Sequence, residues 1–123
     1  MKILIADDSR VMRRIIVRAL RQAGFGRHDI VEAATGREAV ALVATEQPDL
    51  VVSDWHMPVL NGIDALAEMR ASGSRVPMGF VTSDVSESVR ARAAAAGALF
   101  LIPKPLRSDV LRDALTGVLP ARP

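Results

Sequence analysis

The sequence predicts a doubly wound α/β domain, in which helices cover both faces of one parallel β-sheet. Three observations lead to this prediction. Short apolar runs of strand length alternate with longer amphipathic segments along the chain. Most of these runs are continuously apolar, as strands buried on both faces require. The chain of 123 residues is long enough for one domain with a sizeable core.

The first strand and the first helix are expected within the first 24 residues. Residues 3–6 form an apolar run of strand length. Residues 9–23 then repeat apolar side chains at helical spacing, and Gly24 marks the expected end, because glycine readily adopts the left-handed backbone found there. The apolar positions of this predicted helix are Val11, Met12, Ile15, Ile16, Ala19, Leu20 and Ala23.

The next two strands enclose a second helix. A brief strand is expected at residues 29–33, and a more apolar one at residues 50–53. Between them, Thr35 and Glu38 form the T-x-x-E pattern of a capping box, in which each residue hydrogen-bonds backbone groups of the first helical turn. This pattern predicts a helix that begins here and runs to about residue 46.

The second half of the chain continues the alternation. A turn-rich loop leads to a third helix near residue 62, and a fourth strand is expected at residues 78–81. A fourth helix is expected at about 86–96, a fifth strand at 98–102, and a last helix from about 108. Because crossovers between parallel strands are right-handed, these helices should fall on both faces of the sheet.

Composition argues against several classes of protein. The absence of cysteine excludes disulfides and thiolate metal sites. A net charge of only +2 with 3% aromatic residues argues against direct nucleic-acid binding. The N-terminus lacks the pattern of a signal peptide, and no apolar run approaches the ~18–20 residues of a membrane span. We therefore expect a soluble cytoplasmic protein with neither membrane insertion nor direct nucleic-acid binding.

Chemically active side chains follow four of the five predicted strands. Asp7 and Asp8 follow the first strand, Asp54 the third, Thr82 the fourth and Lys104 the fifth. In open α/β sheets, ligands bind outside the carboxyl ends of the strands. Clustered carboxylates repel one another unless a cation neutralises them, and with only oxygen ligands Mg²⁺ is the natural ion. A carboxylate can also accept a phosphoryl group, with a lysine and a hydroxyl binding the phosphoryl oxygens.

Each residue also has an ordinary structural explanation. Asp7 and Asp8 could cap the following helix, and Asp54 could simply end a strand at a turn. Thr82 could cap the next helix, while Lys104 could be an exposed lysine. The joint pattern favours chemistry, because one of only two lysines in the chain follows the predicted fifth strand.

Four motifs make the sequence resemble a known family, the receiver domain of bacterial two-component response regulators, especially the single-domain chemotaxis type. The motifs are LIADDS, VVSDWHMPVLNG, FVTSD and AGALFLIPKP, which stand in the family's order over essentially the whole chain. The resemblance implies a flavodoxin-like receiver fold with strand order 2-1-3-4-5 and five helices. It implies a receiver domain at residues 1–119, followed by a tail or the start of a linker at residues 120–123.

The resemblance also implies roles for individual residues. Asp54 would be the phosphoacceptor. Asp7, Asp8 and Asp54 would hold Mg²⁺ together with the backbone carbonyl of His56. Thr82 would bind the phosphoryl group and change position on phosphorylation.

Further roles concern the surroundings of the acceptor. Lys104 would pair with the acceptor carboxylate or its phosphate, before a proline bond that is usually cis in the family. The side chains of His56 and Asp84 occupy positions from which family members tune dephosphorylation. Trp55, the only tryptophan, either merely packs or lies near the pocket, where its fluorescence would report on Mg²⁺ or phosphate.

One position departs from the family pattern. Receivers commonly carry tyrosine or phenylalanine three residues before the lysine, as part of the switch, and here that residue is Leu101. Phe100 cannot replace it, because neighbouring strand residues face opposite sides of a sheet. Gly79 is also unusual, since glycine weakens the interior of a strand.

The resemblance implies a signalling partner on each side of the reaction. A sensor histidine kinase or a histidine phosphotransfer protein would supply the phosphoryl group, and a downstream protein or a fused output domain would respond to a changed surface around helix 4, strand 5 and helix 5. The domain would assist its own phosphorylation and dephosphorylation without being a turnover enzyme.

Alternatives to a standalone phosphoacceptor stay open. The chain could be a phosphorylation-independent binding scaffold, or a receiver cut from a larger regulator. A phosphatase with an aspartate nucleophile would carry a second acid two residues after that nucleophile, where this chain has His56.

Basic residues concentrate in the predicted first helix. One interpretation is a solvated helix face, and the other is a docking surface for an acidic patch on the phosphodonor, where charge chiefly raises the association rate. The residues are Arg10, Arg13, Arg14, Arg18 and Arg21.

Overall fold

The computed structural model describes residues 1–26 and 28–118. Residue 119 of the predicted domain and the predicted tail at 120–123 lie outside the described residues. Within these described ranges, five strands alternate with five helices. None of the helices in the described part of the chain is long and apolar enough to cross a membrane. The elements are β1 (Lys2–Ala6), α1 (Arg10–Gln22), β2 (Asp29–Ala33), α2 (Gly36–Glu46), β3 (Leu50–Ser53), α3 (Gly62–Ala71), β4 (Met78–Thr82), α4 (Glu87–Ala95), β5 (Leu101–Pro103) and α5 (Ser108–Leu115).

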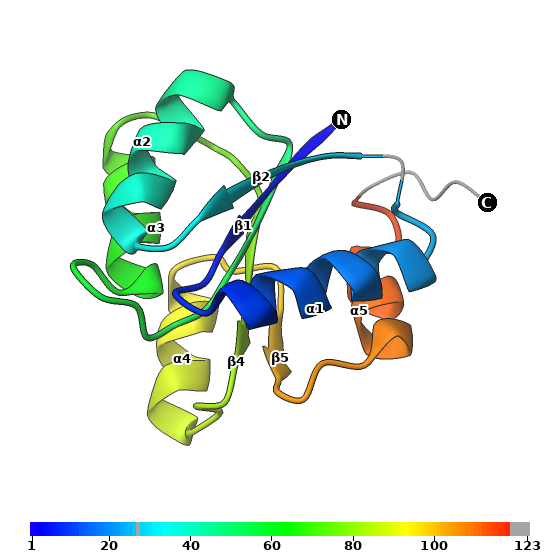
Figure 1. Ribbon diagram of the computed structural model, residues 1–123. Helices are drawn as coiled ribbons and strands as arrows, with labels where there is room; N and C mark the ends of the chain where they lie inside the picture. Colours follow the sequence, from blue (N-terminus) through cyan, green and yellow to red (C-terminus); the bar gives the residue numbers. More distant parts are fainter. Residues whose placement is uncertain (27, 119–123) are drawn as a thin grey trace.

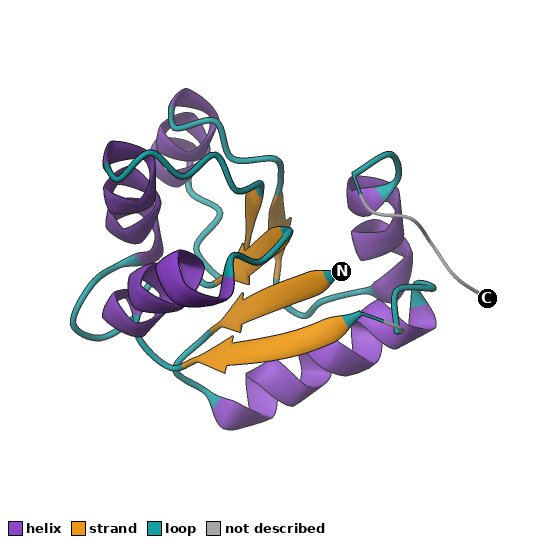
Figure 2. Ribbon diagram, turned by 90° about the horizontal axis from the view of Figure 1, so that it is seen from above, coloured by secondary structure: helices purple, strands orange, loops and turns teal. Residues whose placement is uncertain are grey.

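The strands form one parallel sheet in the order β2-β1-β3-β4-β5, as expected. Helices α1 and α5 cover one face, and α2, α3 and α4 cover the other (Figures 1 and 2). Alternate residues of β1 supply the two cores. Ile3 and Ile5 pack with α1 and α5, whereas Leu4 and Ala6 pack with the helices of the other face. The doubly wound prediction is therefore confirmed.

The N-cap of helix α1 is Ser9, whose side-chain oxygen accepts a hydrogen bond from the backbone amide of Met12. This contact satisfies one of the amides left unpaired at a helix N-terminus. The apolar positions predicted for α1 include two that do not face the sheet, because Val11 and Ile15 are 68% and 43% exposed. They lie outside the stripe that faces the sheet, which is centred on Ile16, Ala19 and Leu20.

The fifth strand is shorter and begins later than predicted. Residues 98–102 were expected, whereas β5 spans Leu101–Pro103. Backbone pairing to β4 nevertheless reaches further back, because the amide of Leu99 donates to Met78 and the carbonyl of Phe100 accepts from Phe80. The loop residues before β5 thus follow β4 without completing the strand pattern.

Gly79 in β4 has a packing reason that its sequence context did not reveal. A Cβ atom built at this position would collide with the ring of Phe100. Phe100 packs against the core on the α1 and α5 side, whereas Leu101 packs on the α4 side. The glycine therefore provides the space in which the Phe100 ring lies against the backbone of β4.

Candidate functional site

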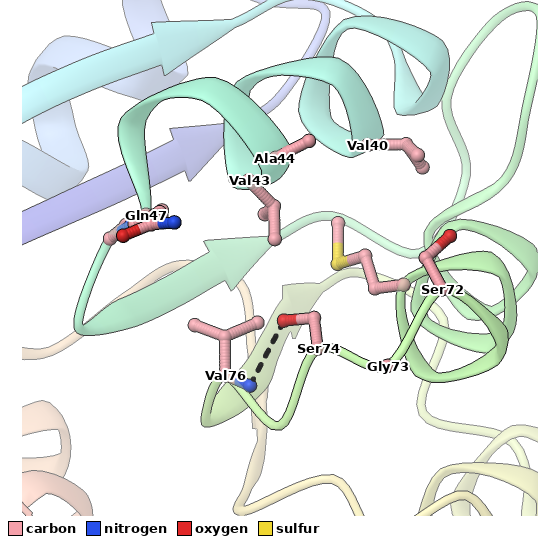
Figure 3. Close-up of a pocket in the computed structure, with 10 residues that line it drawn as sticks. Val40, Val43, Ala44, Gln47, Ser72, Gly73, Ser74 and Val76 are labelled. Carbon is pink, nitrogen blue, oxygen red and sulfur yellow. Dashed lines mark hydrogen bonds between the residues drawn. The ribbon is translucent and has the colours of Figure 1, made fainter.

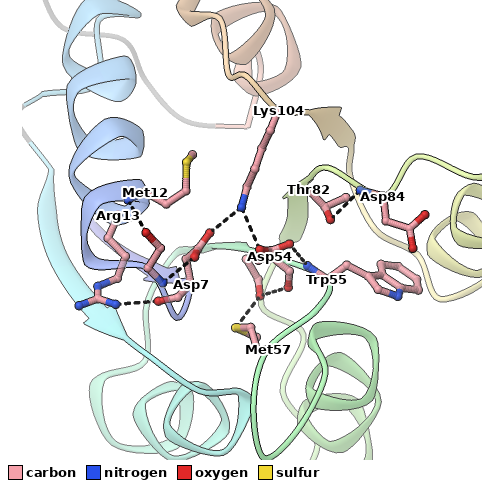
Figure 4. Close-up of polar contacts among 11 residues, drawn as sticks. Asp7, Met12, Arg13, Asp54, Trp55, Met57, Thr82, Asp84 and Lys104 are labelled. Carbon is pink, nitrogen blue, oxygen red and sulfur yellow. Dashed lines mark hydrogen bonds and ion pairs between the residues drawn. The ribbon is translucent and has the colours of Figure 1, made fainter.

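Strand register brings the predicted site residues to one edge of the sheet. Ala6, the last residue of β1, pairs with Ser53, the last residue of β3. Asp7 and Asp54, one residue further on, therefore leave neighbouring strands at the same level. Thr82 ends β4 and pairs with Pro103, which directly precedes Lys104 (Figure 4).

Three carboxylates gather at this edge. Asp7, Asp8 and Asp54 each place one oxygen within 4.8 Å of the oxygens of the other two. Asp7 is 1% exposed and Asp54 8% exposed, whereas Asp8 faces solvent. Burial strengthens their mutual repulsion, because little water screens it. Oxygen ligands at this spacing suit a hard divalent cation such as Mg²⁺.

Lys104 bridges two of the three acids. Its Nζ atom lies 2.9 Å from Oδ2 of Asp54 and 3.1 Å from Oδ2 of Asp7. Burial lowers the pKa of Lys104, but the hydrogen bonds to the two aspartates outweigh it, and the net pKa is raised above 10.5. The Lys104–Pro105 peptide bond is cis, as the resemblance implied. With all three acids ionised, one lysine leaves a formal charge of −2, which a divalent cation would neutralise.

Asp7 accepts hydrogen bonds from a backbone amide and from an arginine side chain. Its Oδ1 atom accepts a hydrogen bond from the amide of Ser9 at 2.9 Å, and its carbonyl accepts one from Arg13 at 2.7 Å. Burial raises its pKa, while the bonds from Ser9 and Lys104 oppose that effect. Because Ser9 is the N-cap, capping by Asp7 or Asp8 does not explain these two acids.

The acceptor candidate Asp54 is fixed by the loop that follows it. The amide of Trp55 donates to Oδ1 of Asp54 at 2.7 Å, which leaves Oδ2 to Lys104. Gly62 closes the loop, because its amide donates to the carbonyl of Trp55. A Cβ atom at Gly62 would collide with the carbonyl of Asp54. Only glycine therefore allows the backbone at position 62 to lie this close to the backbone of Asp54.

Two loop residues pair beside the acidic cluster. Nε2 of His56 lies 2.8 Å from Oδ2 of Asp84, which joins the loop after β3 to the loop after β4. This hydrogen bond lowers the pKa of Asp84, and a further bond from Ser86 adds to the effect. The amide of Asp84 also donates to Oγ1 of Thr82, which is fully buried. The cap of α4 is Ser86, so Thr82 does not serve as that cap.

Three features of the site escaped sequence reasoning. The first is the bond from the Trp55 amide to Asp54, since backbone donors leave no trace in a sequence. The second is Arg13, which the sequence grouped with a surface patch but which pairs with Glu32 and the Asp7 carbonyl. The third is the His56–Asp84 pair, whose members were identified singly; strand-end spacing could have suggested their contact.

A separate groove lies away from this cluster. It has a volume of about 500 Å³ and lies between α2 and α3, lined mainly by apolar side chains such as Val40, Val43 and Met69 (Figure 3). None of its lining residues belongs to the acidic cluster. The lining of this groove therefore gives no support to the predicted chemistry.

Comparison with known proteins identifies the class. Residues 3–116 match the response regulator receiver domain family. The chain is 35% identical over 122 residues to the chemotaxis protein CheY1 of Helicobacter pylori, covering 97% of each chain. It is 34% identical to the response regulator MprA of Mycolicibacterium vanbaalenii, covering 96% of this chain and 50% of that protein. The crystal structure of chemotaxis protein CheY4 from Vibrio cholerae matches with a TM-score of 0.82 at 30% identity, covering 96% and 98% of the two chains.

This chain belongs to the response regulator receiver family. Its relatives include chemotaxis proteins of the CheY type and one regulator about twice as long as the matched segment. Receiver domains are signalling proteins of two-component systems, so the resemblance drawn from the four sequence motifs is confirmed.

Proposed function

We propose that this protein is a phosphoacceptor switch, which accepts a phosphoryl group on Asp54 from a phosphohistidine donor. The observation that carries the proposal is the bridge from Lys104 to both Asp54 and Asp7, inside a cluster of three acids at the sheet edge. A surface carboxylate that merely ended a strand would need neither the buried lysine contact nor two acidic neighbours.

The chemistry follows from the contacts of the Asp54 carboxylate. One of its oxygens attacks phosphorus, an O–P bond forms, and the bond from phosphorus to the imidazole nitrogen of the donor breaks. The imidazole keeps the electron pair. Lys104 then binds an oxygen of the transferred group, and Thr82 donates its hydroxyl hydrogen to another. Attack of water on the phosphorus later releases phosphate and restores the carboxylate.

Mg²⁺ is the proposed cofactor. Asp7, Asp8 and Asp54 would hold it, with the backbone carbonyl of His56 as a further ligand. When bound, the ion supplies positive charge that offsets the carboxylates and the phosphoryl oxygens. Within the described residues, Asp8 makes no hydrogen bond or ion pair, so its carboxylate is free to bind a metal.

Dephosphorylation would be tuned by the side chains of His56 and Asp84. These side chains bind each other beside the acceptor. Their contact joins the loop after β3 to the loop after β4, which supports a role in admitting or excluding the attacking water.

The phosphodonor would dock on α1. Arg13 is occupied by Glu32 and Asp7, but the other four arginines of the helix make no ion pair within the described residues. Val11 and Ile15 lie exposed on the same helix. A basic and partly apolar face next to the acceptor fits a donor surface with acidic and apolar side chains. The four unpaired residues are Arg10, Arg14, Arg18 and Arg21.

The proposal is tested with acetyl phosphate and Mg²⁺, followed by intact-mass measurement. We expect a single phosphoryl adduct in the wild type that requires Mg²⁺ and is missing in Asp54→Asn. Asp113→Asn, on the exposed face of α5, is the matched control and should keep the adduct. A wild type that forms no adduct would favour the phosphorylation-independent scaffold.

A further inference from the structure

Trp55 contacts the acceptor through its backbone and the core through its ring. Its amide donates to Oδ1 of Asp54 at 2.7 Å, while its indole is 2% exposed. In Figure 4 the indole extends away from Asp7, toward the side of the cluster where Thr82 and Asp84 lie. A displacement of the acceptor that moves this amide therefore also moves a large buried ring.

The indole is packed between β4 and α4. It meets the ring of Phe80 edge-on, with centroids 5.0 Å apart and an angle of 61°. The guanidinium carbon of Arg92, on α4, lies over the indole, 5.6 Å from its centroid, which is within the range of a cation–π contact. Phe80 and Arg92 thus hold the ring in one orientation.

Helix α4 packs into the hydrophobic cluster that contains this ring. The buried side chains of α4 are Val89 and Ala93, and both belong to the same hydrophobic cluster as Trp55. Arg92, on the same helix, contacts the indole directly. Close-packed interiors do not deform gradually, so a shift of the ring should change the packing of the helix that shares its cluster.

Leu101 lacks the features that would let it play this part. It packs on the α4 side against the same cluster, but it is only partly buried and carries no ring. Phe100 faces the opposite side of the sheet, against Gly79. Phe80 also lies on the α4 side, but Trp55 is the aromatic residue whose backbone bonds Asp54 and whose ring contacts a side chain of α4.

We infer that Trp55 is the positioning residue that couples Asp54 to α4, in place of an aromatic switch residue at position 101. This inference rests on the proposed phosphorylation of Asp54. Phosphorylation shifts the Trp55 backbone, the indole shifts against Arg92 and Val89, and α4 changes its packing. Because coupling between two sites is reciprocal at equilibrium, a partner that binds α4 through Arg92 also changes how tightly a phosphoryl mimic such as beryllium fluoride binds at Asp54.

The test measures hydrogen exchange in α4 with and without beryllium fluoride and Mg²⁺, which together mimic the phosphoryl group. We expect the wild type to change its exchange over residues 87–95 when the mimic binds. Trp55→Leu should lose most of that change but still form the acetyl phosphate adduct, whereas Trp55→Phe should keep it. Leu101→Ala is the matched control and should respond like the wild type.

A second variant guards against a folding defect in Trp55→Leu. Arg92→Gln changes an exposed side chain and removes only the contact above the indole. We expect it to reduce the α4 response and the change in tryptophan emission, which comes from a single residue. A full α4 response in both Trp55→Leu and Arg92→Gln overturns the inference, as does loss of the response in Leu101→Ala alone.

The outcomes also separate this inference from the proposed function. A wild type that forms the adduct but shows no change in α4 overturns the coupling and leaves the phosphoacceptor proposal standing. A wild type that forms no adduct overturns the phosphoacceptor proposal, and the coupling with it.

Discussion

At the scale of single residues, Lys104 and the three acids determine the electrostatics of the site. Lys104 bonds two carboxylates, and its raised pKa shows that the folded state holds its proton more tightly than the unfolded chain. Asp7 has the opposite character, because burial raises its pKa and its ionised form is unfavourable in the fold. The lysine stabilises a cluster that would otherwise weaken the protein.

The raised pKa of Lys104 predicts a loss of stability at alkaline pH. Stability from its ion pairs is fully present below pH 10.5 and is lost as the pH rises through the folded-state pKa. The chain has no tyrosine and no cysteine, whose side chains would otherwise lose protons in the same range. Urea unfolding between about pH 9 and 12 should show this loss in the wild type and in Lys2→Gln, but not in Lys104→Gln. Equal pH dependence in all three proteins would contradict the assignment.

Removal of one acid should raise the stability of the metal-free protein and weaken its binding of Mg²⁺. Asp8→Asn reduces the repulsion among the carboxylates, so the metal-free protein should gain about 1 kcal/mol of unfolding free energy. Mg²⁺ should then bind about tenfold more weakly, because one charged ligand is lost. Urea unfolding with and without Mg²⁺ measures both effects, with Asp113→Asn as the control. A variant that Mg²⁺ stabilises as much as it does the wild type would show that Asp8 is not a ligand.

At the scale of elements, one contact between a side chain and a glycine joins the loop before β5 to β4. The Phe100 ring occupies the space where a side chain at position 79 would begin. The glycine in the strand and the aromatic residue in the loop are therefore one feature. It keeps Phe100 on the α1 and α5 side and leaves Leu101 facing α4.

A larger residue at position 79 should therefore destabilise the fold, and a smaller residue at position 100 should restore the lost stability. Gly79→Ala forces its methyl group into the Phe100 ring, so we expect a loss of about 1–3 kcal/mol in urea unfolding. In the double variant with Phe100→Ala, the loss due to Gly79→Ala should largely disappear, because the two residues are in contact. Additive effects of the two changes would mean that the ring does not rest on this glycine.

Elements also differ in how well the sequence predicted them. The capping box at Thr35 and Glu38 was recognised, and the Thr35 side chain accepts from the Glu38 amide as predicted. β5 was misplaced because its apolar run, ALFLI, continues through residues that pair only partly with β4. Exposure of Val11 and Ile15 was missed because helical spacing gives the width of an apolar stripe only roughly.

At the scale of the whole molecule, the sheet order determines which residues can meet. The sequence predicted that Asp7, Asp8, Asp54, Thr82 and Lys104 follow strand ends, and a parallel sheet brings such ends to one edge. Contacts made at that edge were not predicted, because they depend on backbone amides and side-chain conformations. The bond from the Trp55 amide to Asp54 leaves no trace in the sequence, whereas strand-end spacing could have suggested the contact between His56 and Asp84.

The proposed docking face makes a prediction about phosphotransfer between proteins. Reversal of charge at Arg14 and Arg18 to glutamate should slow phosphotransfer from a histidine kinase about tenfold or more at low salt, because steering is lost. Phosphorylation by acetyl phosphate should be unchanged. The control pair Arg75→Glu and Arg112→Glu has the same net charge on exposed positions elsewhere. Equal losses with both donors, or with both pairs of variants, would count against docking on α1.

The central claim is that Asp54 itself takes the phosphoryl group, and site mapping tests it most directly. The protein is treated with acetyl phosphate and Mg²⁺, reduced with borohydride, which converts an acyl phosphate to the alcohol, and digested for peptide mass spectrometry. We predict homoserine at position 54, only when both acetyl phosphate and Mg²⁺ are present. Reduction at Asp7 or Asp8 instead, or at no aspartate despite a phosphoryl adduct in the intact protein, would contradict the claim.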